Sequence, residues 1–262
     1  MKQEETNIKA TFYIPFAYLY GVRLRSVPKL LSWLLLYILP TAFYSHLDVL
    51  SYTLVLFATF TLYELGYIFN DTVAVQHESQ PSLRLTDTQT AYFFAHRYLI
   101  IFTRLLIAAL CLCALSTIHP TLNVIHLTLS LMIMLILFTY YNRWRNRYNV
   151  FLYIWLVFSR YIPFMCLAAH SGIDYILLFV SYPLLIGLER FSMPNYRWPF
   201  MRRLIPNEEA KARFRVAYYV LALLVLVPYC YLTGLSLYAL LPIGVLALYR
   251  ILRLVIKKIT RI

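Results

Sequence analysis

The sequence predicts an all-α, polytopic membrane helical bundle, and its composition is the first reason. Hydrophobic residues make up 61% of the 262 residues, charged residues only 13%, and the mean hydropathy is +0.67. A soluble domain, by contrast, carries about 25% charged residues. The second reason is a series of about eight apolar runs long enough to cross a bilayer, so we expect about eight transmembrane helices. The runs lie at about 29–45, 49–69, 97–117, 121–141, 149–168, 173–190, 216–233 and 236–256.

The residues before the first run predict a separate segment. We expect 1–28 to be cytoplasmic or interfacial and 29–262 to form a single transmembrane domain. Residues 1–10 are polar and of mixed charge, so they lack the basic start and apolar core of a signal peptide. Residues 11–27 are rich in aromatic side chains and contain two arginines, which is typical of an amphipathic segment at the membrane surface.

Lysine and arginine are distributed unevenly over the connections between the runs. The short turns at 46–48, 118–120, 169–172 and 234–235 contain none, while the other connections and the chain ends carry nearly all of them. Because basic residues favour the cytoplasmic side, we expect both termini and the charged loops in the cytoplasm and the helices in the cell inner membrane. The net charge of +13 then largely reflects topology. We therefore expect membrane lipids, and no nucleic acid, as partners.

Two acidic residues, Glu64 and Asp71, lie near the end of the second run. They are seven residues apart and therefore share one face of a helix. An ionisable group at the bilayer centre costs about 2.5–3.5 kcal/mol on insertion scales, so it usually faces a polar cavity or a partner. We expect Glu64 either to line a substrate cavity or to pair with Arg97, Arg104 or Arg160.

The second half of the chain repeats parts of this layout. Glu189 ends the sixth run as Asp71 ends the second, and an Arg-Leu pair precedes the seventh run as another precedes the third. A capping-box pattern at Thr86 and Gln89 opens the third helix. We interpret the similarity as a weak internal duplication of two four-helix halves, and such interfaces often hold sites in membrane proteins.

Oxygen ligands gather where the second run ends, at Asn70, Asp71 and Glu78. Mg²⁺ typically binds one or two carboxylates, several waters and the phosphates of its substrate. We therefore expect Asp71 and Glu78 to bind Mg²⁺ together with a phosphate-bearing lipid, and Glu189 to assist from the second half. Asp71 and Asn70 could instead cap a helix, and Glu78 could be a solvated loop residue.

Arginine side chains are the candidates for the phosphate groups, because guanidinium groups bind phosphate oxygens bidentately. Glu64 completes the expected substrate-binding set. Alternatively, Arg143 and Arg145 are charges that flank a span, and Arg160 pairs within the bundle. The arginine candidates are Arg84, Arg143, Arg145, Arg160 and Arg203.

The run 66–71, Gly-Tyr-Ile-Phe-Asn-Asp, resembles the start of the NDxxDxxxD motif of the UbiA superfamily of intramembrane prenyltransferases. The stretch 140–147 is loosely similar to that family's Tyr…Lys-Arg element, and Glu189 lies where its second Asp-rich motif falls. The sequence departs from the pattern at Ala74 and Glu78, which stand where the motif has aspartates. The second motif keeps one acid, and the family usually has nine spanning helices instead of eight.

This resemblance implies an enzyme that transfers a polyprenyl group from a polyprenyl diphosphate to an acceptor, with Mg²⁺ bound to two acidic motifs. On this basis we expect Asp71, Asn70 and Glu189 to be catalytic, and Asp71, Glu78 and Glu189 to bind the metal. Some members of the family instead transfer a phosphoribosyl group onto polyprenyl phosphate, which is one alternative. Another is a non-catalytic lipid-binding or transport protein on the same fold.

Overall fold

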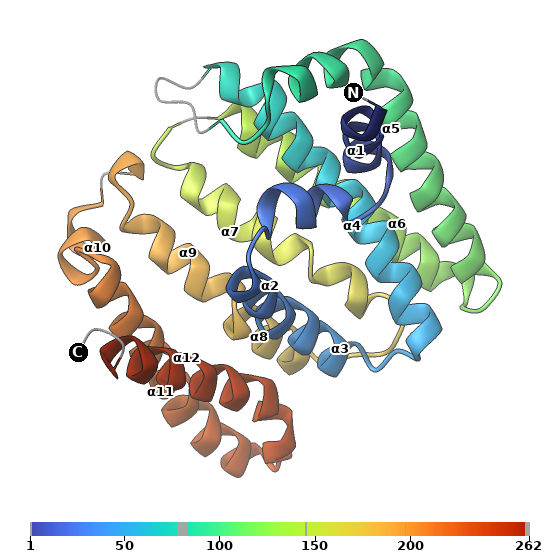
Figure 1. Cartoon of the computed structure of the whole chain (residues 1–262). Coiled ribbons are helices and arrows are strands. Elements are labelled where there is room, and N and C mark those ends of the chain that lie inside the picture. Colours follow the sequence, from blue (N-terminus) through green and yellow to red (C-terminus); the bar gives the residue numbers. More distant parts are fainter. Residues whose placement is uncertain (1, 78–82, 145, 197, 260–262) are drawn as a thin grey trace. The chain divides into compact units, whose positions relative to one another are not determined.

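The computed structural model describes residues 2–77, 83–144, 146–196 and 198–259. Within these ranges the chain forms twelve α-helices and no strand (Figure 1), which confirms the predicted all-α class. The α-helices are α1 (Lys2–Tyr13), α2 (Val27–Trp33), α3 (Leu39–Ser45), α4 (Val49–Thr72), α5 (Asp87–Ser116), α6 (Thr121–Arg143), α7 (Asn149–Ser159), α8 (Gly172–Ser181), α9 (Pro183–Phe191), α10 (Pro199–Leu204), α11 (Glu208–Thr233) and α12 (Leu241–Ile259). The shorter segments are the π-helical η1 (Leu19–Arg23) and η2 (Leu34–Ile38) and the 3₁₀ segments η3 (Ala74–His77), η4 (Ile162–Met165), η5 (Pro194–Tyr196) and η6 (Leu237–Leu240).

The protein is a multi-pass integral membrane protein with six or seven candidate spans in its described part, fewer than the eight expected. The seventh is the pair α8 and α9, which is bent by 45°. The run at 149–168 is helical only as the short α7, which ends at Ser159 before the 3₁₀ segment that contains Pro163. Proline lacks the backbone N–H that a continuing helix needs. The six spans are Val27–Ser45, Val49–Gln76, Asp87–Ser116, Thr121–Arg143, Glu208–Thr233 and Leu237–Ile256.

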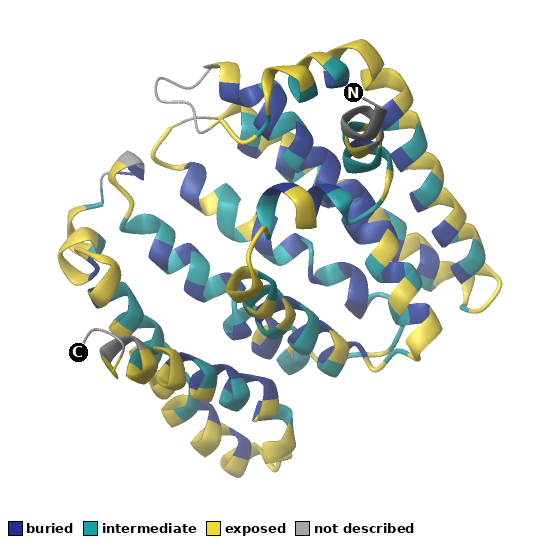
Figure 2. Cartoon of the chain, in the orientation of Figure 1, coloured by how far each residue is buried: buried dark blue, intermediate teal, exposed yellow. Residues whose placement is uncertain are grey.

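Large apolar side chains are exposed along the long helices, as a membrane environment requires. On α5, Leu99, Phe102 and Leu110 are each more than half exposed, and this helix is largely yellow in Figure 2, while α4 is mostly dark blue. In water such a surface would favour aggregation, whereas a lipid bilayer accommodates it. Helices suit that environment because their backbone hydrogen bonds are satisfied internally.

The chain divides into two compact units that are not continuous in sequence. Unit 1 comprises 1–33, 45–145 and 159–169, and unit 2 comprises 34–44, 146–158 and 170–262. Unit 1 therefore contains the N-terminal segment and the long helices α4, α5 and α6, and unit 2 contains the helices from α8 to α12.

In unit 1, α4 packs against both α5 and α6. Close packing on α6 depends on Gly66, since a Cβ atom there would lie 2.3 Å from the ring of Phe138. The predicted capping box is confirmed at the start of α5, where Thr86 Oγ1 accepts the Gln89 backbone N–H and the Gln89 side chain accepts the Thr86 N–H.

In unit 2, α11 packs against α12 and α9. Asn207 caps α11 by accepting the backbone N–H groups of Glu209 and Ala210, and Gly234 ends it with φ +70°. The break between α8 and α9 leaves backbone carbonyls without helical partners. The hydroxyl groups of Tyr218 and Tyr219 donate to two carbonyls at the end of α8, so α11 stabilises the break.

Candidate functional site

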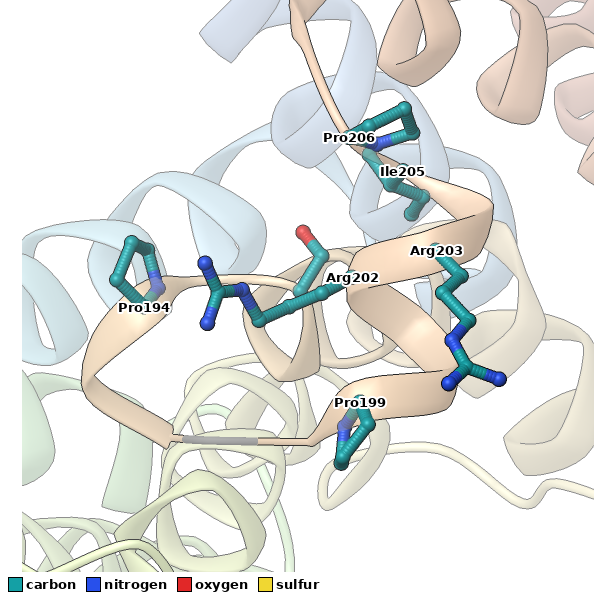
Figure 3. Close-up of a pocket in the computed structure, with 7 residues that line it drawn as sticks. Pro194, Pro199, Arg202, Arg203, Ile205 and Pro206 are labelled. Carbon is teal, nitrogen blue, oxygen red and sulfur yellow. The ribbon is translucent and has the colours of Figure 1, made fainter.

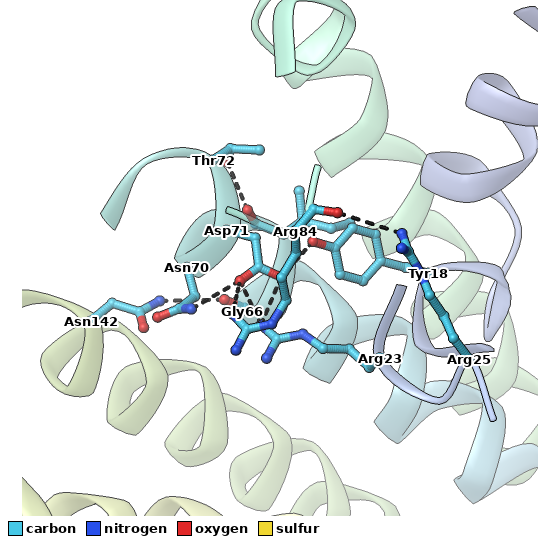
Figure 4. A network of polar contacts seen from close by, with 10 residues as sticks. Tyr18, Arg23, Arg25, Gly66, Asn70, Asp71, Thr72, Arg84 and Asn142 are labelled. Carbon is cyan, nitrogen blue, oxygen red and sulfur yellow. Dashed lines mark hydrogen bonds and ion pairs between the residues drawn. The ribbon is translucent and has the colours of Figure 1, made fainter. Parts of the chain in front are cut away.

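The Asp71 carboxylate lies at the end of α4, and its side chain is fully buried. It accepts hydrogen bonds from Tyr18 Oη at 2.7 Å, Arg84 Nη1 at 3.0 Å and Asn70 Nδ2 at 3.1 Å. Arg23 Nη2 lies 2.7 and 2.8 Å from its two oxygens (Figure 4). Two guanidinium groups therefore converge on one acid.

The partners of Asp71 come from segments on both sides of it in the sequence. Tyr18 and Arg23 belong to the N-terminal segment around η1, and Arg84 precedes α5. The Arg23 guanidinium lies 4.2 Å from the ring centroid of Tyr67, one turn before Asp71 on α4. The N-terminal segment is thus held against the polar end of a membrane-spanning helix.

A third arginine joins the group. Arg25 Nη2 donates to the backbone carbonyl of Arg84 at 3.5 Å, and its Nε donates to the carbonyl of Gly21 at 2.6 Å. We define the Asp71 cluster as Tyr18, Arg23, Arg25, Asp71 and Arg84. It contains three guanidinium groups and one carboxylate, so its formal charge is 3 − 1 = +2.

Tyr18 is a stable hydrogen-bond donor to this cluster. Burial, followed by the negative charge of Asp71 and the hydrogen bond to it, raises the pKa of Tyr18 far above its usual value. The phenol therefore stays protonated and donates to Asp71 throughout the physiological pH range.

Glu64 has a different environment from Asp71, although both hold the same N-terminal segment. Its Oε2 lies 2.5 Å from Arg104 Nη1, and both side chains are 0% exposed. Glu64 also accepts the backbone N–H groups of Phe16 at 2.9 Å and Leu19 at 2.6 Å. The structure therefore provides the partner expected of an intramembrane acid, and Arg104 is one of the three candidates predicted.

Arg104 also binds the backbone of the N-terminal segment. Its Nε and Nη2 donate to the backbone carbonyls of Phe12 at 2.9 Å and Ile14 at 3.1 Å. The chain turns here, with Phe16 at φ +68°, and its backbone groups are not satisfied by a regular helix. The Glu64–Arg104 pair supplies those partners.

Glu189 lies in unit 2 and is 3% exposed. Arg215 Nε and Nη2 bind its two oxygens at 2.6 and 2.7 Å, a bidentate pair, and Lys211 Nζ lies 3.9 Å away. Arg250 on α12 is also buried and lies within electrostatic range of Glu189 and Arg215. We define the Arg250 cluster as Glu189, Lys211, Arg215 and Arg250.

The remaining predicted residues do not join either cluster. Arg143 is exposed at the end of α6. The Arg160 guanidinium lies 5.5 Å from the ring of Tyr63 and 5.4 Å from that of Tyr161, within unit 1. Glu78 and Arg145 lie outside the described residues. Of the predicted set, Asn70, Asp71 and Arg84 come together.

A pocket of about 520 Å³ lies in the link between α9 and α11. In Figure 3, Arg202 extends toward Pro194, and Arg203 lies on the side of Pro199. Both arginines are exposed. Arg203, one of the predicted phosphate-binding residues, is therefore available to solvent. The pocket is lined by Ser192, Pro194, Pro199, Arg202, Arg203, Ile205 and Pro206.

The described donor set does not fit a resident Mg²⁺ ion at Asp71. The carboxylate already accepts two guanidinium groups, a phenol and an amide, which are donors and not metal ligands. No group of three His, Cys, Asp or Glu side chains in the described ranges could hold a metal. Mg²⁺ binding that involves Glu78 therefore stays a prediction from sequence.

Sequence reasoning missed Tyr18, Arg23 and Arg25 as members of the site, because the aromatic and basic pattern around them is typical of a surface segment. It also missed Arg215 and Arg250. A usable signal was present in each case: basic side chains end the aromatic stretch within 11–27, Arg215 directly precedes the seventh apolar run, and Arg250 interrupts the eighth. No family model, curated protein or solved structure matches this chain.

Proposed function

We propose that this protein binds the phosphate end of a polyprenyl lipid at the Asp71 cluster and transfers the polyprenyl group to an acceptor, as a UbiA-type transferase. The observation that carries the proposal is that two guanidinium groups, those of Arg23 and Arg84, bind one buried carboxylate at the end of a membrane-spanning helix, and that a third, from Arg25, contacts the backbone of Arg84. Asp71, which accepts a hydrogen bond from Tyr18, orients Arg23 and Arg84. The N–H donors of these two arginines that do not contact Asp71 bind the lipid phosphate.

The donor capacity of the arginines supports this role. A guanidinium group has five N–H donors, and Arg23 and Arg84 contact Asp71 through one nitrogen each. The Arg23 Nε atom is buried and has no hydrogen-bond partner among the described residues. Guanidinium groups bind phosphate bidentately, with charge-assisted hydrogen bonds.

The aromatic side chains beside the cluster suit an unsaturated lipid. Tyr67 lies under Arg23, and Tyr63 and Phe138 pack edge-on against Tyr67 with centroid distances of 4.9 and 5.7 Å. Aromatic faces attract positive charge, which develops on the first carbon of an isoprenoid as its diphosphate leaves.

The proposed reaction breaks the bond between that carbon and the bridging oxygen, and both electrons leave with the diphosphate. A nucleophilic atom of the acceptor forms the new bond to the carbon and releases its proton to solvent. Arg23 and Arg84 stabilise the charge that grows on the leaving group. The reaction is proposed without a step through a metal ion.

Binding of a radiolabelled polyprenyl diphosphate to the purified full chain in detergent tests the phosphate site. Arg84→Gln should weaken binding by about tenfold or more, since a hydrogen bond to a charged group contributes about 1.5–3 kcal/mol. Arg147→Gln is the control, because Arg147 is exposed and contacts the neighbouring Tyr148. Equal affinity of the two variants would exclude the Asp71 cluster as the site.

A second candidate is glycosyl or phosphoribosyl transfer onto a polyprenyl phosphate. The charge of the cluster favours it, because +2 matches the charge of about −1.5 to −2 on a phosphate monoester at pH 7. Here a lipid phosphate oxygen attacks the anomeric carbon of the donor, and diphosphate leaves. Incubation with labelled phosphoribosyl diphosphate or labelled prenyl diphosphates separates the two reactions by which label enters lipid. Binding without incorporation from either donor would favour the non-catalytic alternative.

The cell inner membrane, with both termini and the charged loops in the cytoplasm, is the proposed location. Its support is the uneven distribution of lysine and arginine. Reporter fusions at either end of the chain test it, and a reporter active only outside the cytoplasm should stay inactive at both ends.

A further inference from the structure

The Arg250 cluster in unit 2 contains more positive than negative charge. Lys211, Arg215 and Arg250 provide three cations. Glu189 provides one carboxylate, and Glu208, whose Oε1 lies 3.5 Å from Lys211 Nζ, provides a second, which gives 3 − 2 = +1. The Glu189 carboxylate is committed to Arg215, which binds both of its oxygens. Arg250 lies within electrostatic range of this ion pair, in which the carboxylate of Glu189 is already bound by Arg215.

Arg250 is the anomaly in this group. Its side chain is 5% exposed, and its Nε atom is buried without a hydrogen-bond partner in the described part of the chain. Its guanidinium carbon lies 5.2 Å from the ring of the adjacent Tyr249. A guanidinium group cannot release its proton in a protein, and burial of an unpaired charge is strongly unfavourable. A counter-charge from outside the described chain would relieve this cost.

The side chains of α11 near Arg250 are held in place, and part of the Arg250 cluster is exposed. The hydroxyl groups of Tyr218 and Tyr219 are committed to carbonyls of α8, so the α11 side of the cluster is held in place. The side chains of Arg215 and Lys211 are partly exposed, at 24% and 27%. An anion can therefore approach along these two side chains.

We propose that the Arg250 cluster binds a phosphate group, either free phosphate or diphosphate or the headgroup of an anionic lipid. Arg250 and Arg215 are the expected bidentate ligands, because paired guanidinium N–H groups match phosphate oxygens. Glu189 is then a positioning residue that holds Arg215. This site lies in unit 2 and does not depend on the lipid site proposed at the Asp71 cluster in unit 1.

Thermal unfolding of the purified full chain tests the site, with phosphate or diphosphate added at an ionic strength matched by sodium chloride. A second arm compares nanodiscs of phosphatidylcholine with nanodiscs that contain phosphatidylglycerol. Arg250→Gln is compared with Arg253→Gln, a matched control on the same helix whose guanidinium is exposed and contacts Tyr249. All variants are also measured in an Arg84→Gln background, so that anion binding at the Asp71 cluster is weakened equally.

If the inference holds, at least one anion raises the Tm of the Arg84→Gln protein and of its Arg253→Gln derivative, and Arg250→Gln weakens that response at least tenfold in anion concentration. A response to phosphate or diphosphate identifies a free anion, and a response only to phosphatidylglycerol identifies a lipid headgroup. Without anion, Arg250→Gln should be at least as stable as the parent, because it removes a buried charge that has no ion-pair partner within contact distance in the described part of the chain. Lower stability of Arg250→Gln without anion, or equal responses of the Arg250 and Arg253 variants, would overturn the site.

Discussion

Glu64 and Arg104 form an ion pair in which both side chains are completely buried, and the pair holds four backbone groups of the N-terminal segment. Glu64 binds two backbone N–H groups, and Arg104 binds two carbonyls. The pair therefore connects α4 and α5 to the turn between α1 and η1 and to the two residues, Phe12 and Leu19, that flank it. The pair thereby holds the segment that supplies Tyr18 and Arg23 to the Asp71 cluster.

Removal of one member of this pair should destabilise the protein strongly. We expect Arg104→Gln to lower the free energy of unfolding by about 3–5 kcal/mol, because it leaves Glu64 charged and buried. Arg213→Gln, which breaks an exposed pair with Glu209, should cost at most about 1 kcal/mol. Thermal unfolding in detergent measures both. Limited proteolysis should cut the N-terminal segment of Arg104→Gln first, and comparable stability of the two variants would contradict the assignment.

Gly66 should not tolerate a side chain. A Cβ atom there would lie 2.3 Å from the Phe138 ring, so we expect Gly66→Ala to lower the free energy of unfolding by about 1–3 kcal/mol. Phe138→Leu should recover part of the loss in the double variant, since the contact is then relieved. Gly244→Ala on α12 is the control: a Cβ atom at Gly244 would have no neighbour within 4 Å, and this variant should gain about 0.5–1 kcal/mol.

The local features of the fold could be predicted from sequence, and the pairings mostly could not. The helices, the cap at Thr86 and the shared face of Glu64 and Asp71 depend on residues within two turns of one another. The partners of Asp71 include Tyr18 and Arg23, 53 and 48 residues away. Periodicity carries no information about such distant contacts.

The expected span at 149–168 shows the limit of hydropathy as well. This run is apolar enough to cross a membrane, but its helix ends at Ser159, and Pro163 lies in the 3₁₀ segment that follows. Apolar composition measures burial or lipid exposure, whereas helix continuity depends on single residues. Hydropathy also could not decide which of three arginines is the partner of Glu64. Arg104 could be identified only from the packing of α4 on α5.

Tyr18→Phe should destabilise the protein in a pH-dependent manner. Below pH 10, the usual pKa of tyrosine, the phenol is protonated in both the folded and the unfolded chain, and the loss should be about 1.5–3 kcal/mol for a hydrogen bond to a charged group. Above pH 10 the unfolded phenol loses its proton, while the folded phenol, whose pKa is raised by burial and by Asp71, does not.

The stability that Tyr18 provides is therefore fully present below pH 10 and declines above it, by about 1.4 kcal/mol per pH unit. The difference in unfolding free energy between wild type and Tyr18→Phe should be constant from pH 7 to pH 9 and shrink between pH 10 and pH 11. Denaturant unfolding at these pH values measures it. A difference that grows above pH 10 would show that the phenol is not the donor to Asp71.

Asp71→Asn should separate binding from turnover. The change keeps the side-chain size but removes the one carboxylate of the Asp71 cluster, whose formal charge rises from +2 to +3. A polyprenyl phosphate or diphosphate should therefore bind about as tightly as before.

Arg23 and Arg84 lose the acceptor that orients them, however, and loss of positioning can reduce turnover by about a hundredfold. We expect membrane insertion to be intact, KM to change less than kcat, and kcat for product formation from the labelled donor to fall by about a hundredfold. Asp87→Asn, at an exposed position in the first turn of α5, is the control and should retain turnover. Unchanged turnover in Asp71→Asn would remove Asp71 from the proposed mechanism, since no other described acid in the Asp71 cluster could replace it.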